Sequence, residues 1–98
     1  MERYQITLHS PMGPRRGALE LLDGRQAAVT LLGYRSLVEA QRLEGGLVCL
    51  TGRLNSIMGD IQLDVSLRVE NGRFDCLAHT GKGDMRLTGR RVEEQGAD

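Results

Sequence analysis

The sequence repeats one short segment three times, as His9-Ser10-Pro11-Met12-Gly13-Pro14, Asn55-Ser56-Ile57-Met58-Gly59-Asp60 and His79-Thr80-Gly81-Lys82-Gly83-Asp84. Alternating apolar and polar residues flank every copy, and a weaker fourth copy, Leu31-Leu32-Gly33-Tyr34-Arg35, lies between the first two. Glycine-containing turns between alternating segments are typical of β-hairpins. The repeat therefore predicts a chain that doubles back at regular intervals.

Between these turns, apolar residues occupy every second position, as at Tyr4, Ile6 and Leu8 and again at Ile61, Leu63, Val65 and Leu67. This period is that of a strand with one buried and one solvated face. A second set of turns separates the hairpins at Asp23-Gly24-Arg25, Glu44-Gly45-Gly46 and Asn71-Gly72-Arg73. Together the turns predict eight strands, over residues 2–10, 15–22, 26–32, 35–43, 46–55, 60–69, 73–80 and 84–92. The alternative for residues 37–40 is a short helix.

Eight consecutive antiparallel strands with short connections can close on themselves, which removes both sheet edges and buries the apolar face. We therefore expect an all-β fold, an eight-stranded antiparallel up-and-down β-barrel forming one domain over residues 1–92, with a flexible C-terminal tail at 93–98. Gly17, Gly52 and Gly89 lie inside the strands and support closure, because glycine often marks a bend at a barrel corner. The alternatives are a two-sheet sandwich of the same strands and a half-open sheet completed by dimerisation.

The chain resembles a small uncharacterised bacterial domain family with a calycin-type, or lipocalin-like, β-barrel. The segments that carry this resemblance are Ser10-Pro11-Met12-Gly13-Pro14, Arg16-Gly17-Ala18-Leu19, Thr51-Gly52-Arg53-Leu54 and Leu87-Thr88-Gly89. The resemblance runs nearly end to end and implies the barrel fold. Its motifs are turn and corner glycines, so it implies no catalytic or ligand-binding residue. Because the chain has no tryptophan, it lacks the Gly-x-Trp motif of true lipocalins and avidins.

The charge balance excludes several classes of partner. Thirteen basic and thirteen acidic residues give a formal net charge of zero, so no field of one sign attracts a polyanion or an anionic lipid. Nucleic-acid-binding barrels also need stacking aromatic residues along a basic groove, and aromatic residues make up only 3% of the chain. We expect no nucleic acid and no membrane as partner. The first residues contain no apolar signal region, and no apolar run could span a bilayer, which indicates a cytoplasmic location.

The polar residues near the turns form no recognisable catalytic arrangement. Ser10, Ser56 and Thr80 flank turns, where local hydrogen bonding explains a hydroxyl, and Asp60 and Asp84 are residues that turns favour. A nucleophile needs an adjacent base and an orienting acid. We therefore expect that the protein is not an enzyme.

The histidines and cysteines likewise predict no metal site and no cofactor. His9 and His79 lie on first and seventh strands that the eighth strand separates, roughly 10 Å apart at ordinary strand spacing. Zinc ligands lie at about 2.1 Å from the metal, so two histidines at this separation are too far apart to share one zinc ion. Strand alternation places Cys49 and Cys76 on different faces of the sheet, so we expect no disulfide.

In an up-and-down topology, the turns at Gly13, Gly33, Gly59 and Gly83 gather at one end of the barrel. We call it the glycine-turn end. Asn, Asp and Gly are the usual residues at hairpin tips, whereas this end has Met12, Tyr34, Ile57 and Met58. Clustered exposed apolar side chains commonly mark a ligand or partner surface, and methionine suits adaptable contacts. Three basic residues near the same end are candidates to hold an acidic head group: Lys82, Arg15 and Arg35.

The sequence therefore predicts a binding module for a small apolar or amphipathic ligand at the glycine-turn end. The alternative is a protein-interaction or homo-oligomerisation module, such as a homodimer, that uses the same end. An opposing interpretation is that these side chains fold inward and cork the barrel. An eight-stranded barrel is just wide enough to fill itself or to hold one small ligand, and we expect a filled interior for so short a chain.

Overall fold

The computed structural model describes residues 2–22, 25–57 and 59–92. Eight strands follow one another along the chain: β1 (Glu2–Ser10), β2 (Gly13–Leu21), β3 (Gln26–Leu31), β4 (Tyr34–Arg42), β5 (Leu47–Leu54), β6 (Ile61–Arg68), β7 (Arg73–Thr80) and β8 (Gly83–Arg91). A 3-10 turn, η1 (Glu44–Gly46), connects β4 to β5. Residues 37–40 lie within β4, so the helix alternative is wrong.

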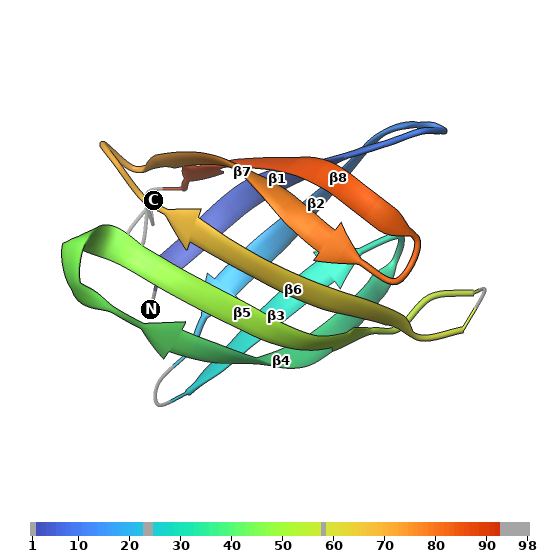
Figure 1. The fold of residues 1–98 in the computed structure, drawn as a ribbon, viewed down its shortest axis with the longest axis horizontal. Coiled ribbons are helices and arrows are strands. Elements are labelled where there is room, and N and C mark those ends of the chain that lie inside the picture. The colour runs from blue at the N-terminus through green and yellow to red at the C-terminus, as the bar shows by residue number, and fades with distance from the viewer. Residues whose placement is uncertain (1, 23–24, 58, 93–98) are drawn as a thin grey trace, which may run out of the picture.

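Each strand pairs with its neighbours in the sequence, and the first strand pairs with the last (Figure 1). The β1–β8 ladder runs from the Tyr4–Arg91 pair to the His9–Arg86 pair. All the ladders are antiparallel, so the fold is the expected closed up-and-down barrel. The sandwich and the half-open sheet are therefore wrong. Among the described residues, no helix is long and apolar enough to cross a membrane.

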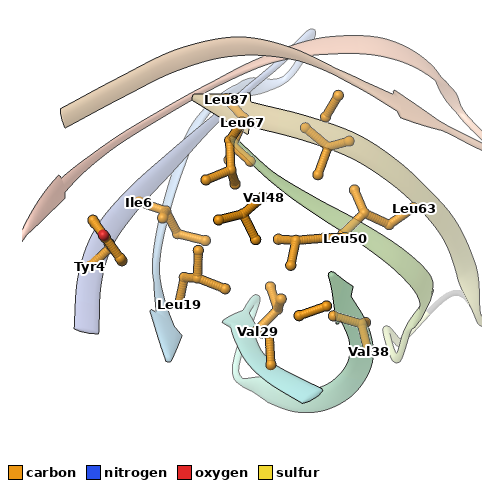
Figure 2. Packing of buried hydrophobic residues seen from close by; sticks show 14 of the residues in the cluster. Tyr4, Ile6, Leu19, Val29, Val38, Val48, Leu50, Leu63, Leu67 and Leu87 are labelled. Atoms are coloured by element: carbon orange, nitrogen blue, oxygen red, sulfur yellow. The ribbon is translucent and has the colours of Figure 1, made fainter. Parts of the chain in front are cut away.

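The apolar side of each strand faces the barrel interior, as the alternation predicts. In β6, for example, Leu63, Val65 and Leu67 are buried while the residues between them are exposed. Figure 2 shows side chains from β1 to β6 and from β8 converging on one core, with Leu19, Val48 and Leu50 among them. Burying this face is the main favourable contribution to the free energy of folding.

A row of alternating large and glycine residues crosses five strands where the barrel wall curves. Its members pair in the order Leu31, Gly17, Ile6, Gly89, Phe74. A Cβ added at Gly89 would lie 2.3 Å from the Phe74 ring, and one at Gly17 would lie 2.0 Å from the Thr30 carbonyl oxygen and 2.6 Å from the Leu31 side chain. The two glycines therefore allow a close approach of neighbouring backbone and large side chains, another common role of glycine inside a strand.

The repeated segment forms one recurrent turn. In three hairpins a hydroxyl donates a hydrogen bond of 2.6 Å to the carbonyl oxygen of the glycine three residues later: Ser10 to Gly13, Ser56 to Gly59 and Thr80 to Gly83. Each glycine has a positive φ, between 101° and 112°, which favours a residue without a Cβ. The prediction of a repeated hairpin is confirmed.

The opposite end of the barrel carries a polar cluster around Glu2. The Tyr4 hydroxyl donates a hydrogen bond of 3.2 Å to the Glu2 carboxylate, which also forms ion pairs with Arg42 and Arg91. The Tyr4 ring is buried and packs edge-on against Phe74, with ring centroids 5.6 Å apart. Burial opposes ionisation of Glu2, but Arg42 and the other partners hold the pKa of the carboxyl below its ordinary value. A hydrogen-bonded and ion-paired cluster therefore lies at this end.

Candidate binding site at the glycine-turn end

All four glycine turns lie at the same end of the barrel, on the right in Figure 1. Met12 and Ile57 are 83% and 86% exposed, and Tyr34 is 41% exposed. Met12 and Ile57 thus point into solvent, and the interpretation in which they cork the barrel is wrong. The β1–β2 and β5–β6 hairpins, which carry these two residues, project on separate sides of the end (Figure 1). Met58 lies outside the described residues.

The three basic candidates differ in position. Arg15 pairs with Leu8, so the two lie on the inward-facing side of the sheet, but Arg15 is exposed because this hairpin extends beyond the packed core. Lys82 is exposed at the tip of the β7–β8 hairpin. Arg35 lies on the outer wall, where its Nε is 3.8 Å from a carboxylate oxygen of Glu20. Of these three residues, Arg15 and Lys82 therefore have no side-chain partner among the described residues.

Leu32 is a feature of this end that the sequence interpretation missed. It occupies the first position of the β3–β4 turn with φ 56°, and it is 48% exposed. At the opposite end, the β6–β7 turn has nearly the same backbone, with Asn71 at φ 53° and Gly72 at φ 72°. Asn is enriched at positive φ, whereas a bulky side chain there is strained by on the order of 1–3 kcal/mol. The chain thus keeps a strained, exposed leucine where asparagine fits without strain.

A small apolar cavity lies inside the barrel beneath these turns. Its volume is about 50 Å³, and its wall includes Leu8, Leu31, Leu32, Leu54, Ile61 and Met85. The remaining interior is packed with side chains. Ligand pockets for drug-sized molecules have volumes of about 300–1,000 Å³, so this cavity holds only the end of an apolar group. We call it the mouth cavity.

Among the described residues, Ser36 is the one polar residue that is buried, and it lies at an inward-facing position of β4. Its hydroxyl accepts a hydrogen bond of 2.8 Å from the backbone N–H of Asn55, which lines the mouth cavity. This bond joins β4 to the start of the β5–β6 turn beyond the last β4–β5 ladder pair. It therefore fixes one side of the cavity wall and satisfies the polar group.

The histidines and cysteines have separate local partners. His9 lies 3.2 Å from the Thr88 hydroxyl, and His79 lies 2.8 Å from the Asp84 carboxylate. Cys76 is partly buried, and burial together with the charge of Asp75 raises the pKa of its thiol to about 11. A thiol with such a pKa is a poor nucleophile at neutral pH. The described residues contain no group of three or more metal-ligating side chains.

The importance of Leu32 depends on the turn conformation. A positive φ at a leucine cannot be recognised from periodicity, although Leu-Gly in place of the usual Asn-Gly is a signal that the sequence does contain.

Comparisons of the chain with family models, with curated proteins and with solved structures found no match. The candidate site therefore rests on the residues and geometry described above.

Proposed function

We propose that this protein is a non-enzymatic, cytoplasmic binding module that holds the apolar end of a small amphipathic molecule at the glycine-turn end. The observation that carries the proposal is Leu32, an exposed and strained leucine that also lines an apolar cavity. Strained residues persist where the surrounding structure or a function maintains them. The resemblance to calycin-type barrels is compatible with this function but does not identify a ligand.

The size of the mouth cavity determines how such a ligand would bind. A volume of about 50 Å³ is of the order of one or two water-sized groups, so only the end of an acyl or alkyl chain enters. The rest of the ligand's acyl or alkyl chain would lie against the exposed side chains of Leu32 and Tyr34. Arg15 and Lys82, exposed and without a side-chain partner among the described residues, complement an acidic head group.

The second candidate is a protein-interaction or homo-oligomerisation module that uses the same end. The exposure of Met12 and Ile57 on hairpins that project beyond the cavity favours it, because these side chains are placed to contact a surface larger than one small molecule. In this case an apolar side chain of the partner would enter the mouth cavity.

Titration with decanoate, followed by isothermal calorimetry, tests the proposal. Leu32→Asn removes an apolar wall of the cavity while keeping the turn, and we expect it to weaken decanoate binding about tenfold, since burying a leucine contributes on the order of 1.5–3 kcal/mol. The matched control is Leu77→Asn, which removes an exposed leucine from the outer wall of β7. Equal weakening by both variants, or no decanoate binding at all, contradicts the small-ligand proposal.

Analytical ultracentrifugation of the same proteins tests the second candidate. A dimer that is present in the original protein, persists without decanoate and dissociates on Leu32→Asn but not on Leu77→Asn supports self-association through this end. A monomer at all concentrations contradicts self-association.

A further inference from the structure

The outer wall of the barrel contains a second, much larger concavity. It has a volume of about 1,000 Å³ and crosses β2, β1, β8 and β7 to the end of β6. Short polar side chains form its centre: Thr7 pairs with Thr88 across the β1–β8 ladder, and Gln5 pairs with Arg90 one row further along. Because β1, β8 and β7 carry their apolar residues inward, these polar residues face solvent. We call this concavity the outer groove.

Arginines surround the polar centre of the outer groove. They come from four different strands: Arg16, Arg68, Arg73 and Arg90. The Arg16 and Arg73 side chains form no hydrogen bond or ion pair with another described residue. Arg90 donates two hydrogen bonds to the Gln5 amide oxygen, and Arg68 donates one to the Gly45 carbonyl. Neither the Gln5 amide nor the Gly45 carbonyl carries a charge. These hydrogen bonds therefore do not compensate the positive charges of the arginines.

The two acidic residues of the groove compensate little of this charge. Asp75 accepts two hydrogen bonds from Arg86, which lies beside the groove on β8. The Asp75 carboxylate is therefore already neutralised by a fifth arginine. Glu70 forms no side-chain hydrogen bond or ion pair with another described residue, so its single negative charge stands against the four arginines. Although the whole chain has a net charge of zero, the groove is locally positive.

The β6–β7 ladder is open at one end of the groove. This hairpin has pairs at Leu63–Thr80 and Asp64–His79 and a bridge at Glu70–Arg73, but its intervening described residues, 65–69 and 74–78, have no ladder pair. The strands spread apart between these points in Figure 1. The backbone N–H of Val69 donates to the Gly46 carbonyl on the β5 side, and Glu70 and Arg73 bond to each other across the hairpin. Because backbone groups alternate in direction along a strand, those of Arg68 and Asp75 face the opening. They add backbone donors and acceptors to the arginine-lined end of the groove.

We propose that the outer groove binds an extended acidic polypeptide segment. Three strand spacings separate β2 from β7, about 14 Å, which four or five extended residues span. Carboxylates of the segment pair with Arg16, Arg73 and Arg90, because guanidinium groups match carboxylates in planar geometry. The Thr7 and Thr88 hydroxyls bond to the peptide backbone between them. This site is separate from the mouth cavity and independent of the function proposed for it.

Two features favour a polypeptide over a nucleic acid. The groove offers no exposed aromatic ring for base stacking, since Phe74, the aromatic residue in its wall, is buried against Tyr4. Glu70 lies among the arginines without an ion-pair partner among the described residues, so a backbone with a charge at every phosphate meets repulsion there. A peptide with spaced carboxylates avoids this position.

Titration of the ¹⁵N-labelled protein with an eight-residue oligo-glutamate peptide, followed by NMR, tests the proposal. We expect shift changes concentrated at Thr7, Thr88 and the arginines of the groove, and weaker binding as the salt concentration rises. The double variant Arg16→Glu, Arg73→Glu should lower the affinity about tenfold or more. Its matched control is Arg25→Glu, Arg53→Glu, which has the same net charge but reverses two exposed arginines outside the groove.

Equal loss of affinity in both double variants, or shift changes spread over the whole surface, overturns the proposal in favour of non-specific attraction. Tighter binding of a single-stranded DNA octamer at the same residues overturns the choice of a polypeptide. The absence of shifts with oligo-glutamate at low salt overturns the site itself. Decanoate binding should be unchanged by the Arg16, Arg73 double variant, so failure of this proposal is distinguishable from failure of the mouth cavity.

Discussion

At the scale of single residues, turns at the two ends of the barrel place different residue types at the same left-handed backbone conformation. Asn71 at one end and Leu32 at the other both adopt a φ near 55° ahead of a glycine. Asparagine tolerates this conformation because its short polar side chain bonds locally, whereas leucine does not. The proposed function accounts for this difference, because Leu32 lines the mouth cavity and would be retained there at some cost in stability.

Leu32→Asn should therefore stabilise the protein, by about 1 kcal/mol, because it relieves the strain of a bulky residue at positive φ. Urea unfolding followed by circular dichroism measures this as a higher midpoint with an unchanged slope. Asn71→Leu, the reverse exchange at the opposite end, should destabilise by a similar amount. A lower midpoint for Leu32→Asn would show that the leucine contributes more by packing than it costs in strain.

At the scale of strands, the alternation and the glycine turns were sufficient to predict all eight strands. The observed strand bounds lie within two residues of the expected ones. The sequence suggested bends at Gly17 and Gly89, whereas the structure shows large side chains packed close over both. These contacts could not be predicted, because the register between strands is a property of the folded barrel. The open middle of the β6–β7 ladder was missed for the same reason, since its residues alternate as regularly as those of any paired strand.

Gly89→Ala tests the glycine row directly. The added methyl group would lie 2.3 Å from the Phe74 ring, and we expect a loss of about 1–3 kcal/mol in the free energy of unfolding. In a protein that already carries Phe74→Leu, adding Gly89→Ala should lower the free energy of unfolding by less than it does in the original protein. In the control Gly81→Ala the methyl group meets its nearest neighbour at an ordinary 3.6 Å. Similar unfolding midpoints for the two glycine variants would contradict the close packing in the row.

At the scale of the whole molecule, the two ends of the barrel differ: ion pairs around Glu2 lie at one end, and the mouth cavity lies at the other. The sequence predicted which turns share an end, because an up-and-down chain places alternate turns together. It did not reveal the ion-pair cluster around Glu2, which joins β1, β4 and β8. Nor did it reveal the volume of the mouth cavity or the outer groove, since each depends on how side chains of distant segments fill the space between strands.

The Glu2 cluster predicts a specific dependence of stability on pH. Because the pKa of Glu2 is lower in the folded state than its ordinary value of 4.5, its contribution to stability is complete above that value and is lost as the pH falls through the folded pKa. Glu2→Gln should therefore destabilise the protein by about 0.5–1 kcal/mol at pH 7, with the difference shrinking below pH 4.5.

Thermal unfolding at several pH values measures this difference. The control is Glu39→Gln, which removes an exposed carboxylate of β4 that has no side-chain partner among the described residues. A constant difference between the original protein and Glu2→Gln from pH 7 to pH 3 would contradict the role given to the Glu2 ion pairs.

The account depends most on the glycine-turn end being the end that binds an apolar group. Mapping decanoate by ¹H–¹⁵N NMR shift perturbation on the full chain tests this directly, since each backbone amide reports its own position. The account predicts that the largest changes fall on Leu32, Asn55, Thr80 and Met85 around the mouth cavity. Changes centred instead on Arg42 and Arg91 at the opposite end, or no changes at all, would contradict it.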